Sequence, residues 1–284
     1  MSGRLIGQAE VIALATDGSS YTDGAVQEAI FLAQTCGAKI VVLNVIPIDS
    51  ESMMGAYTFS AGMSEEIKSH LDNVSKMAKD HGIECDVVFE ESFQPDKSIV
   101  ELARQHKADI LIMGRHGRRG LLKLLVGSMT AKVIGHGFPR VLVVPKDFTL
   151  GGERILVAVD GSVASDMAAE EAIDMGMHCS NLKEIYVLSV TSSEEGLDQA
   201  KELTEAICKK GQGKAQQVAF HPLAVVGKHA PEIIAAQALE NKVDMILVGG
   251  HGKGLSKLLM GHVTEKVIGK AHCAVLVLEK KEGE

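Results

Sequence analysis

The chain contains one pattern twice, and this duplication constrains its fold more than any other feature. The first copy reads ILIMGRHGRRGLLKLLVGSMTAKVIG over residues 110–135, and the second reads MILVGGHGKGLSKLLMGHVTEKVIG over 245–269. In each copy an apolar run ends at glycines, a short basic segment follows, and a stretch of helical character begins after another glycine. A repeat this long is a whole domain rather than one unit of a solenoid.

Matches outside these copies extend the duplication over nearly the whole chain. Asp17-Gly18-Ser19 near the start corresponds to Asp160-Gly161-Ser162. We therefore predict two domains, at residues 1–147 and 153–284, and the segment KDFTLGGE at 146–153 is the natural linker because it breaks the periodicity. Two domains of roughly 140 residues are each large enough to bury about two-thirds of their unfolded surface.

Composition narrows the class of protein. No apolar run approaches the ~20 residues that a membrane span needs, and the N-terminus lacks the order of a signal peptide. The five cysteines are odd in number and show no CxxC spacing, which indicates reduced thiols. The net charge of −8 argues against a nucleic-acid partner. We expect a cytoplasmic protein with no membrane or nucleic-acid partner.

Each repeat alternates strands and helices. In the first repeat we expect strands at 11–16, 39–47, 84–92, 109–114 and 140–145, with helices at 22–36, 64–81, 98–106 and 128–134. In the second repeat the strands fall at 154–160, 184–190, 216–225, 244–249 and 274–279. Most of these strands are near-continuous Val, Ile and Leu runs, which are typical of parallel sheets covered by helices on both faces.

The connections predict an α/β fold with two tandem, doubly wound, Rossmann-like domains. Right-handed crossovers give the strand order 3-2-1-4-5 when strands two and three lie on one side of strand one. The winding then reverses between strands one and four, where open α/β sheets bind ligands. Strand one ends at Asp17-Gly18 and strand four ends at residues 114–117, so the most polar strand ends fall at the predicted pocket.

The loop after strand four has the spacing Gly114-x2-Gly117-x9-Gly127-Ser128. Glycine lets the backbone approach a ligand closely, and the first N–H groups of the following helix favour an anion. We expect the hydroxyls of Ser128 and Thr130 to add donors, while positive charge comes from Arg118, Arg119 and Lys123. Asp17 would face ribose hydroxyls or a phosphate-bound metal. The alternative, in which these glycines only form turns, stays open on the residues alone.

With these motifs in both halves, the chain resembles a tandem member of the universal stress protein family, whose fold is adenine nucleotide alpha-hydrolase-like. The resemblance implies binding of ATP, ADP or AMP. On the residues alone, we expect no metal held by the protein itself, and any Mg to be held through the phosphates near Asp17. It also implies that the fifth strands pair antiparallel, giving an internal pseudo-dimer of the two domains; a further homodimer stays open. The implied ligand contacts are Ala15, Thr16, Asp17, Val45, Gly114, His116, Gly117, Gly127, Ser128, Met129 and Thr130.

The second repeat departs from this pattern in the segment expected to bind the phosphates. Only eight residues separate Gly252 from Gly261, one basic residue is absent, and His262 replaces Ser128. An adenine pocket remains recognisable, so we expect a weaker second site. Its residues are Ala158, Asp160, Val190, Gly249, Gly252, Gly261 and His262.

Three functions are compatible with these motifs: a nucleotide-binding stress-response or signalling module, a slow ATPase, and an interaction scaffold with empty pockets. GxxxxGK[ST], GxGxxG and GxSxG motifs are absent, and no residue beyond Asp17 is a candidate general base. The eleven histidines show no ligand spacing for a metal. We therefore expect binding without fast catalysis, and no catalytic residue is assigned. The Met-rich insertion at 53–63, which the second repeat lacks, is either a surface loop or a lid or docking segment.

Overall fold

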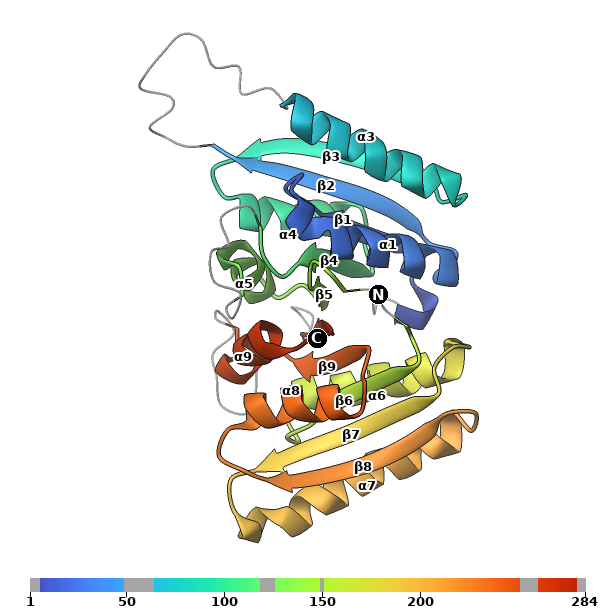
Figure 1. Cartoon of the computed structure of the whole chain (residues 1–284), viewed down its shortest axis with the longest axis vertical. Helices are drawn as coiled ribbons and strands as arrows, with labels where there is room; N and C mark the ends of the chain where they lie inside the picture. Colours follow the sequence, from blue (N-terminus) through green and yellow to red (C-terminus); the bar gives the residue numbers. More distant parts are fainter. Residues whose placement is uncertain (1–5, 49–63, 118–125, 149–150, 251–259, 280–284) are drawn as a thin grey trace.

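The computed structural model describes residues 6–48, 64–117, 126–148, 151–250 and 260–279. These residues form one ten-stranded sheet with the order β3-β2-β1-β4-β5-β10-β9-β6-β7-β8 (Figure 1). The first repeat fills the upper half of Figure 1 and the second repeat the lower half. Both halves show the strand order 3-2-1-4-5, which confirms the predicted topology.

The elements of the first repeat follow the predicted alternation. The strands are β1 (Val11–Ala15), β2 (Lys39–Pro47), β3 (Cys85–Ser92), β4 (Ile110–Gly114) and β5 (Arg140–Val144). The helices are α1 (Asp23–Cys36), α3 (Glu65–Asp80), α4 (Pro95–Gln105) and α5 (Ser128–Gly135), with short 3-10 turns η1 (Ile6–Gln8) and η2 (Ser20–Thr22). Helix α4 begins at Pro95 rather than at the predicted Ser98, because proline fits the first helical turn, where its missing N–H leaves no bond unmade.

The second repeat repeats this order. Its strands are β6 (Arg154–Ala158), β7 (Glu184–Thr191), β8 (Ala219–Val226), β9 (Met245–Gly249) and β10 (Ala274–Leu278). Its helices are α6 (Val163–His178), α7 (Leu197–Lys214), α8 (Ala230–Glu240) and α9 (His262–Lys270), with the turn η3 (Glu194–Gly196). Strand β8 starts three residues later than the predicted 216, because the N–H of Val218 donates to the Ala215 carbonyl in a turn.

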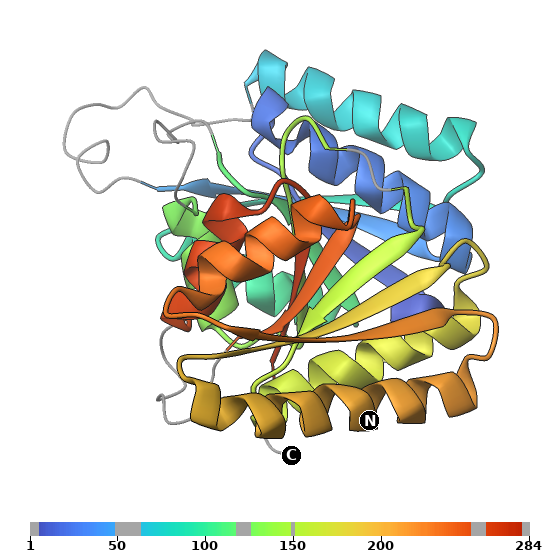
Figure 2. The same cartoon turned by 60° about the horizontal axis from the view of Figure 1, so that its bottom comes forward.

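Helices cover both faces of the sheet and bury its central strands completely. One face packs against α1, α3, α6 and α7, and the other packs against α4, α5, α8 and α9. Figure 2 shows α6 and α7 beneath the strands of the second repeat, with α8 and α9 on the opposite side. All residues of β4, β5 and β10 are buried, as the continuous apolar runs predicted. None of the described helices is both long and apolar enough to cross a membrane.

The two repeats meet where β5 pairs with β10. The pairing is antiparallel, with Leu142 opposite Leu276, and it confirms the predicted junction between the fifth strands. Pairing also removes two strand edges that would otherwise be exposed. A buried ion pair crosses the same junction: Arg140 Nε lies 2.7 Å from Glu171 Oε2, and Glu171 Oε1 accepts a 2.6 Å hydrogen bond from the Ile6 N–H. The repeats are therefore one continuous structure.

Candidate functional site

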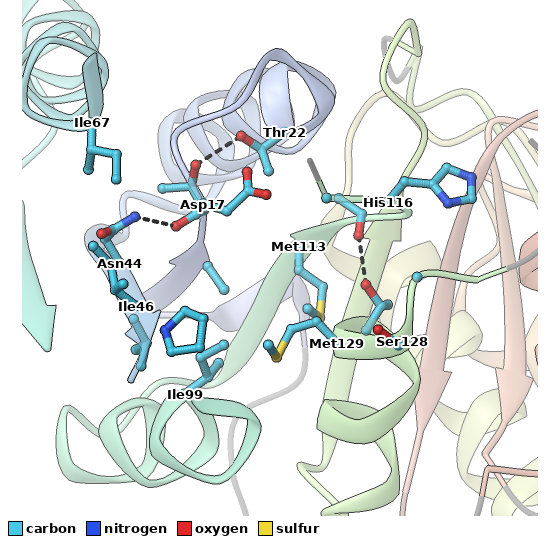
Figure 3. Close-up of a pocket in the computed structure, with 18 residues that line it drawn as sticks. Asp17, Thr22, Asn44, Ile46, Ile67, Ile99, Met113, His116, Ser128 and Met129 are labelled. Atoms are coloured by element: carbon cyan, nitrogen blue, oxygen red, sulfur yellow. Dashed lines mark hydrogen bonds between the residues drawn. The ribbon is translucent and has the colours of Figure 1, made fainter. Parts of the chain in front are cut away.

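A cavity of about 410 Å³ opens at the carboxyl ends of β1 and β4, where the winding of the first repeat reverses (Figure 3). This is the position that the strand order predicts for a ligand. The eleven residues that the family resemblance implied as ligand contacts all line the cavity. They are Ala15, Thr16, Asp17, Val45, Gly114, His116, Gly117, Gly127, Ser128, Met129 and Thr130.

Seven further residues complete the wall of the cavity: Thr22, Asn44, Ile46, Pro47, Ile67, Ile99 and Met113. Asn44, Ile46 and Pro47 are neighbours of Val45 on β2, and Met113 precedes Gly114. Their closeness in sequence to predicted site residues is the signal that could have identified them. Ile67 and Ile99 come from α3 and α4, and their position depends on how those helices pack onto the sheet. Sequence patterns give no signal for such contacts.

The exit of β1 holds the Asp17 carboxylate in a fixed orientation. The Ser19 N–H and hydroxyl both donate to Asp17 Oδ1, at 3.0 and 2.6 Å. Gly18 has a φ of 75°, the left-handed conformation that glycine adopts readily. Gly117 is needed beside Asp17, because a Cβ atom there would lie only 2.7 Å from Asp17 Oδ2. The Asp-Gly motif after β1 and the glycine motif after β4 therefore meet at the Asp17 carboxylate.

The loop after β4 returns to the strand end through a backbone hydrogen bond. The Gly127 N–H donates to the Arg115 carbonyl at 2.9 Å, and a Cβ atom on Gly127 would lie 3.1 Å from that oxygen. Helix α5 then begins at Ser128, and because Ser128 and Met129 line the cavity, the N-terminus of the helix borders it. Arg118, Arg119 and Lys123 lie outside the described residues.

The structure corrects the expected role of the Thr130 hydroxyl. Thr130 is buried, and its Oγ1 donates a 3.0 Å hydrogen bond to the Gly114 carbonyl. A hydroxyl carries one hydrogen, so this group is no donor to a ligand. It instead ties the first turn of α5 to the end of β4.

The cavity is apolar away from these strand ends. Ile46, Ile67 and Ile99 lie on one side of it in Figure 3, and Met113 and Met129 project from the other. His116 stands at its polar end, where burial and then the charge of Arg115 hold the pKa of the imidazole below its usual range. The cavity therefore combines an apolar slot with a carboxylate, a neutral imidazole and a helix N-terminus.

The second repeat has an equivalent cavity of about 390 Å³. Ala158, Asp160, Val190, Gly249, Gly261 and His262 line it as predicted; Gly252 lies outside the described residues. Thr264 Oγ1 donates to the Gly249 carbonyl at 2.7 Å, which reproduces the bond of Thr130. The frame of the site is therefore the same in both repeats.

The two sites differ in charge at the helix N-terminus that borders each cavity. His262 is the exposed first residue of α9, and Glu265 stands in the first turn of this helix, at the position that Ala131 holds in α5. A carboxylate at a helix N-terminus opposes the binding of an anion there. This difference adds to the missing basic residue that the sequence shows.

No group of three or more His, Cys, Asp or Glu side chains is arranged for a metal ion within the described part of the chain. Magnesium held by ligand phosphates near Asp17 stays a prediction.

Comparison with known proteins agrees with the duplicated fold. The sequence profile of the universal stress protein family matches residues 9–145 and again 152–279. A universal stress protein of Methanocaldococcus jannaschii is 34% identical over 139 residues, which are 48% of this chain and 81% of the relative. One of Mycobacterium bovis is 24% identical over 290 residues, covering 94% of this chain and 96% of the relative.

A solved structure extends the likeness to the whole fold. The crystal structure of a universal stress protein from Archaeoglobus fulgidus superposes with a TM-score of 0.78 and covers 99% of both chains at 21% identity. The family sequence occurs twice in succession, and the fold of both copies is that of a relative of the same length. The chain therefore belongs to the universal stress protein family.

Proposed function

We propose that the first repeat binds an adenine nucleotide, and that this chain is a nucleotide-binding stress-response or signalling module. One observation carries the proposal: a single cavity joins an apolar slot, the Asp17 carboxylate and the N-terminus of α5. These three parts match a base, a ribose and a phosphate chain in the order in which a nucleotide presents them.

Each part has a physical role in the proposal. The slot between Ile46, Ile99 and Met113 accepts a flat, apolar base. Asp17 is an acceptor for ribose hydroxyls, and Ser19 already holds one of its oxygens. The free N–H groups of Ser128 and Met129 and the positive end of the α5 dipole attract phosphate. The family resemblance supports ATP, ADP or AMP, and Mg bound through the phosphates near Asp17 is a further part of the proposal.

The second cavity is proposed as a weaker site because of two differences at the start of α9, where the phosphates would lie. His262 stands in place of the Ser128 hydroxyl, and Glu265 stands in place of the Ala131 methyl group. The cytoplasmic location expected from the sequence is part of the same proposal. Binding without fast hydrolysis remains the expected behaviour.

The proposal is tested by placing a negative charge at the start of α5. Ser128→Glu is suited to this because the side chain is exposed and a carboxylate at a helix N-terminus is compatible with the helix dipole. Val163→Glu adds the same charge at the exposed first residue of α6 and serves as the control. ATP affinity is measured by calorimetry, and nucleotide retained through purification is identified on anion exchange after denaturation.

We expect micromolar-scale ATP affinity in the unaltered chain, retained in Val163→Glu and lost in a folded Ser128→Glu variant. Single-turnover measurements on the same samples separate a binder from a slow ATPase. No ATP binding by the unaltered chain would overturn the proposal in favour of a scaffold. Equal affinity in the Ser128→Glu variant would show that the phosphates lie elsewhere.

A further inference from the structure

Helix α3 packs against the exit of β1 through two residues on one face of the helix: Ile67, which lines the first cavity, and His70, which contacts a residue of the cavity wall. Ile67 lines the cavity, and a Cβ atom on Gly18 would lie 3.1 Å from Ile67 Cγ1. His70 follows three residues later, and its Nε2 lies 3.0 Å from Thr16 Oγ1. Residues three apart are neighbours on a helix surface, so both contacts dock α3 onto the exit of β1.

The directions of the hydrogen bonds around Thr16 follow from counting hydrogens. Thr22 Oγ1 donates its one hydrogen to the Ser19 carbonyl at 2.8 Å, so in its 2.8 Å contact with Thr16 Oγ1 it accepts. Thr16 therefore donates to Thr22, and its oxygen accepts from its other two partners. One of these is the Gly18 N–H at 3.1 Å, and the other is His70. For all four contacts to be hydrogen bonds, His70 Nε2 carries the hydrogen and donates it to Thr16.

These bonds form a relay that leads to the carboxylate of the proposed site. It runs from His70 to Thr16, from Thr16 to Thr22, and from Thr22 to the carbonyl of Ser19. Ser19 in turn donates two hydrogen bonds to Asp17 Oδ1. Thr16 and Thr22 are buried, so breaking any bond of this relay would leave a buried polar group with no water to replace the lost hydrogen bond. The orientation of Asp17 is thereby connected to the docking of α3.

The second repeat lacks the first links of this relay. Val159 stands where the first repeat has Thr16, so no hydroxyl is present to receive a donor from a neighbouring helix. Ser165, the counterpart of Thr22, donates to the Ser162 carbonyl at 2.9 Å as Thr22 does to Ser19, and the Ser162 N–H donates to Asp160 Oδ1 at 2.9 Å. The links that differ are therefore those made by Thr16 and by the helix that packs on it. The residues that line the second cavity include none from α7, the counterpart of α3.

We infer that His70 is a positioning residue for the ribose contact of the first site: it holds Asp17 in its binding orientation through Thr16, Thr22 and Ser19. This inference rests on the proposed function and deepens it, because it assigns part of the selectivity for a ribose with free hydroxyls to a helix outside the nucleotide loop. It also predicts that the two repeats differ in their selectivity for the ribose, in addition to their difference in phosphate binding.

The test compares two ligands that differ only in the ribose hydroxyls, ATP and 2′,3′-dideoxy-ATP. His70→Ala removes the donor at the start of the relay, and Thr16→Val gives the first repeat the residue of the second. His70→Gln is the matched control, because the glutamine amide keeps an N–H donor on a side chain of similar reach. Binding of both ligands is measured by calorimetry, and thermal unfolding of each ligand-free variant checks its fold.

We expect His70→Ala and Thr16→Val each to weaken ATP binding about two- to tenfold, as the loss of one neutral hydrogen bond predicts. Binding of 2′,3′-dideoxy-ATP should stay unchanged in His70→Ala, whose altered side chain does not line the cavity, and His70→Gln should keep the affinity for ATP. The double variant should lose no more than the larger single effect, since both changes interrupt one relay.

Two results would overturn the inference while leaving the proposed function intact. The first is unchanged ATP affinity in folded His70→Ala and Thr16→Val. The second is an equal loss for both ligands in His70→Ala, which would show that α3 only supports the fold. If His70→Ala does not fold, unchanged ATP affinity in folded Thr16→Val is sufficient to overturn the inference. Failure of the unaltered chain to bind ATP is a separate outcome that overturns the proposed function and this inference together.

Discussion

Replacing Arg140 by methionine should destabilise the junction between the repeats far more than the loss of a surface ion pair. Arg140 is 7% exposed and Glu171 is 1% exposed, and the Nε–Oε2 distance between them is 2.7 Å. In the Arg140→Met variant the Glu171 carboxylate keeps its bond from the Ile6 N–H but loses its counter-charge. Breaking a buried pair in this way typically costs about 3–5 kcal/mol.

Arg154→Met is a matched control within the same sheet. Arg154 is the first residue of β6, as Arg140 is of β5, and its Nε also bonds a glutamate, Glu184 Oε1, at 2.8 Å. Its pair is about one-third exposed, with side-chain exposures of 33% and 26%. Exposed pairs contribute about 0–1 kcal/mol, so the two variants should differ by several-fold in their loss of stability.

The effect should also depend on pH with a defined sign. Burial raises the pKa of Glu171, and the charge of Arg140 opposes that rise, so removing Arg140 raises the pKa further. An acid whose folded-state pKa lies above its unfolded value destabilises the fold at higher pH, and this penalty disappears as pH falls below the folded value. The loss in Arg140→Met should therefore shrink on acidification.

Urea unfolding of the unaltered chain and both variants between pH 5 and pH 8 measures these differences through the transition midpoints. The reasoning is refuted if Arg140→Met loses no more stability than Arg154→Met at pH 8. It is also refuted if the loss in Arg140→Met grows as the pH falls.

Two further predictions concern the second site and the thiols. The second cavity should bind ATP roughly 10- to 150-fold more weakly than the first, from the loss of one charge-assisted hydrogen bond, and the gap should narrow for adenosine; native mass spectrometry counts the sites, and two sites of equal ATP affinity would contradict this. The buried cysteines should resist alkylation near neutral pH, because burial raises the pKa of Cys273 to about 12 and that of Cys208 to about 11. Peptide mass spectrometry after iodoacetamide treatment measures this, and rapid labelling of native Cys273 would show that its surroundings open in solution.

The duplication and the apolar runs predicted most of the fold because both depend on local spacing. Parallel strands with right-handed crossovers have few possible orders, so the place of the cavity followed from the pattern. The residues that were missed, such as Ile67 and Ile99, reach the cavity from helices whose docking depends on distant side chains. The Thr130 hydroxyl was assigned to the ligand because a sequence does not show which acceptor a hydroxyl reaches.

The ion pair at the junction was not predicted either, for a related reason. Arg140 begins a strand, and Glu171 lies 31 residues further along the chain, on a helix of the other repeat. Only the pairing of β5 with β10 brings these two positions together. No periodicity in either segment indicates such a contact.

The ion pair also makes the two halves unequal as partners. Internal symmetry relates Arg140 to Ala274 and Glu171 to the buried Glu28, so both repeats carry the acid and only the first carries the base. Two second repeats joined in this way would bury two carboxylates with no arginine opposite either one. Joining the halves in one chain gives every copy of the second repeat a first repeat as its neighbour. The covalent link between the repeats therefore determines that each second repeat pairs with a first repeat, in addition to keeping the two close together.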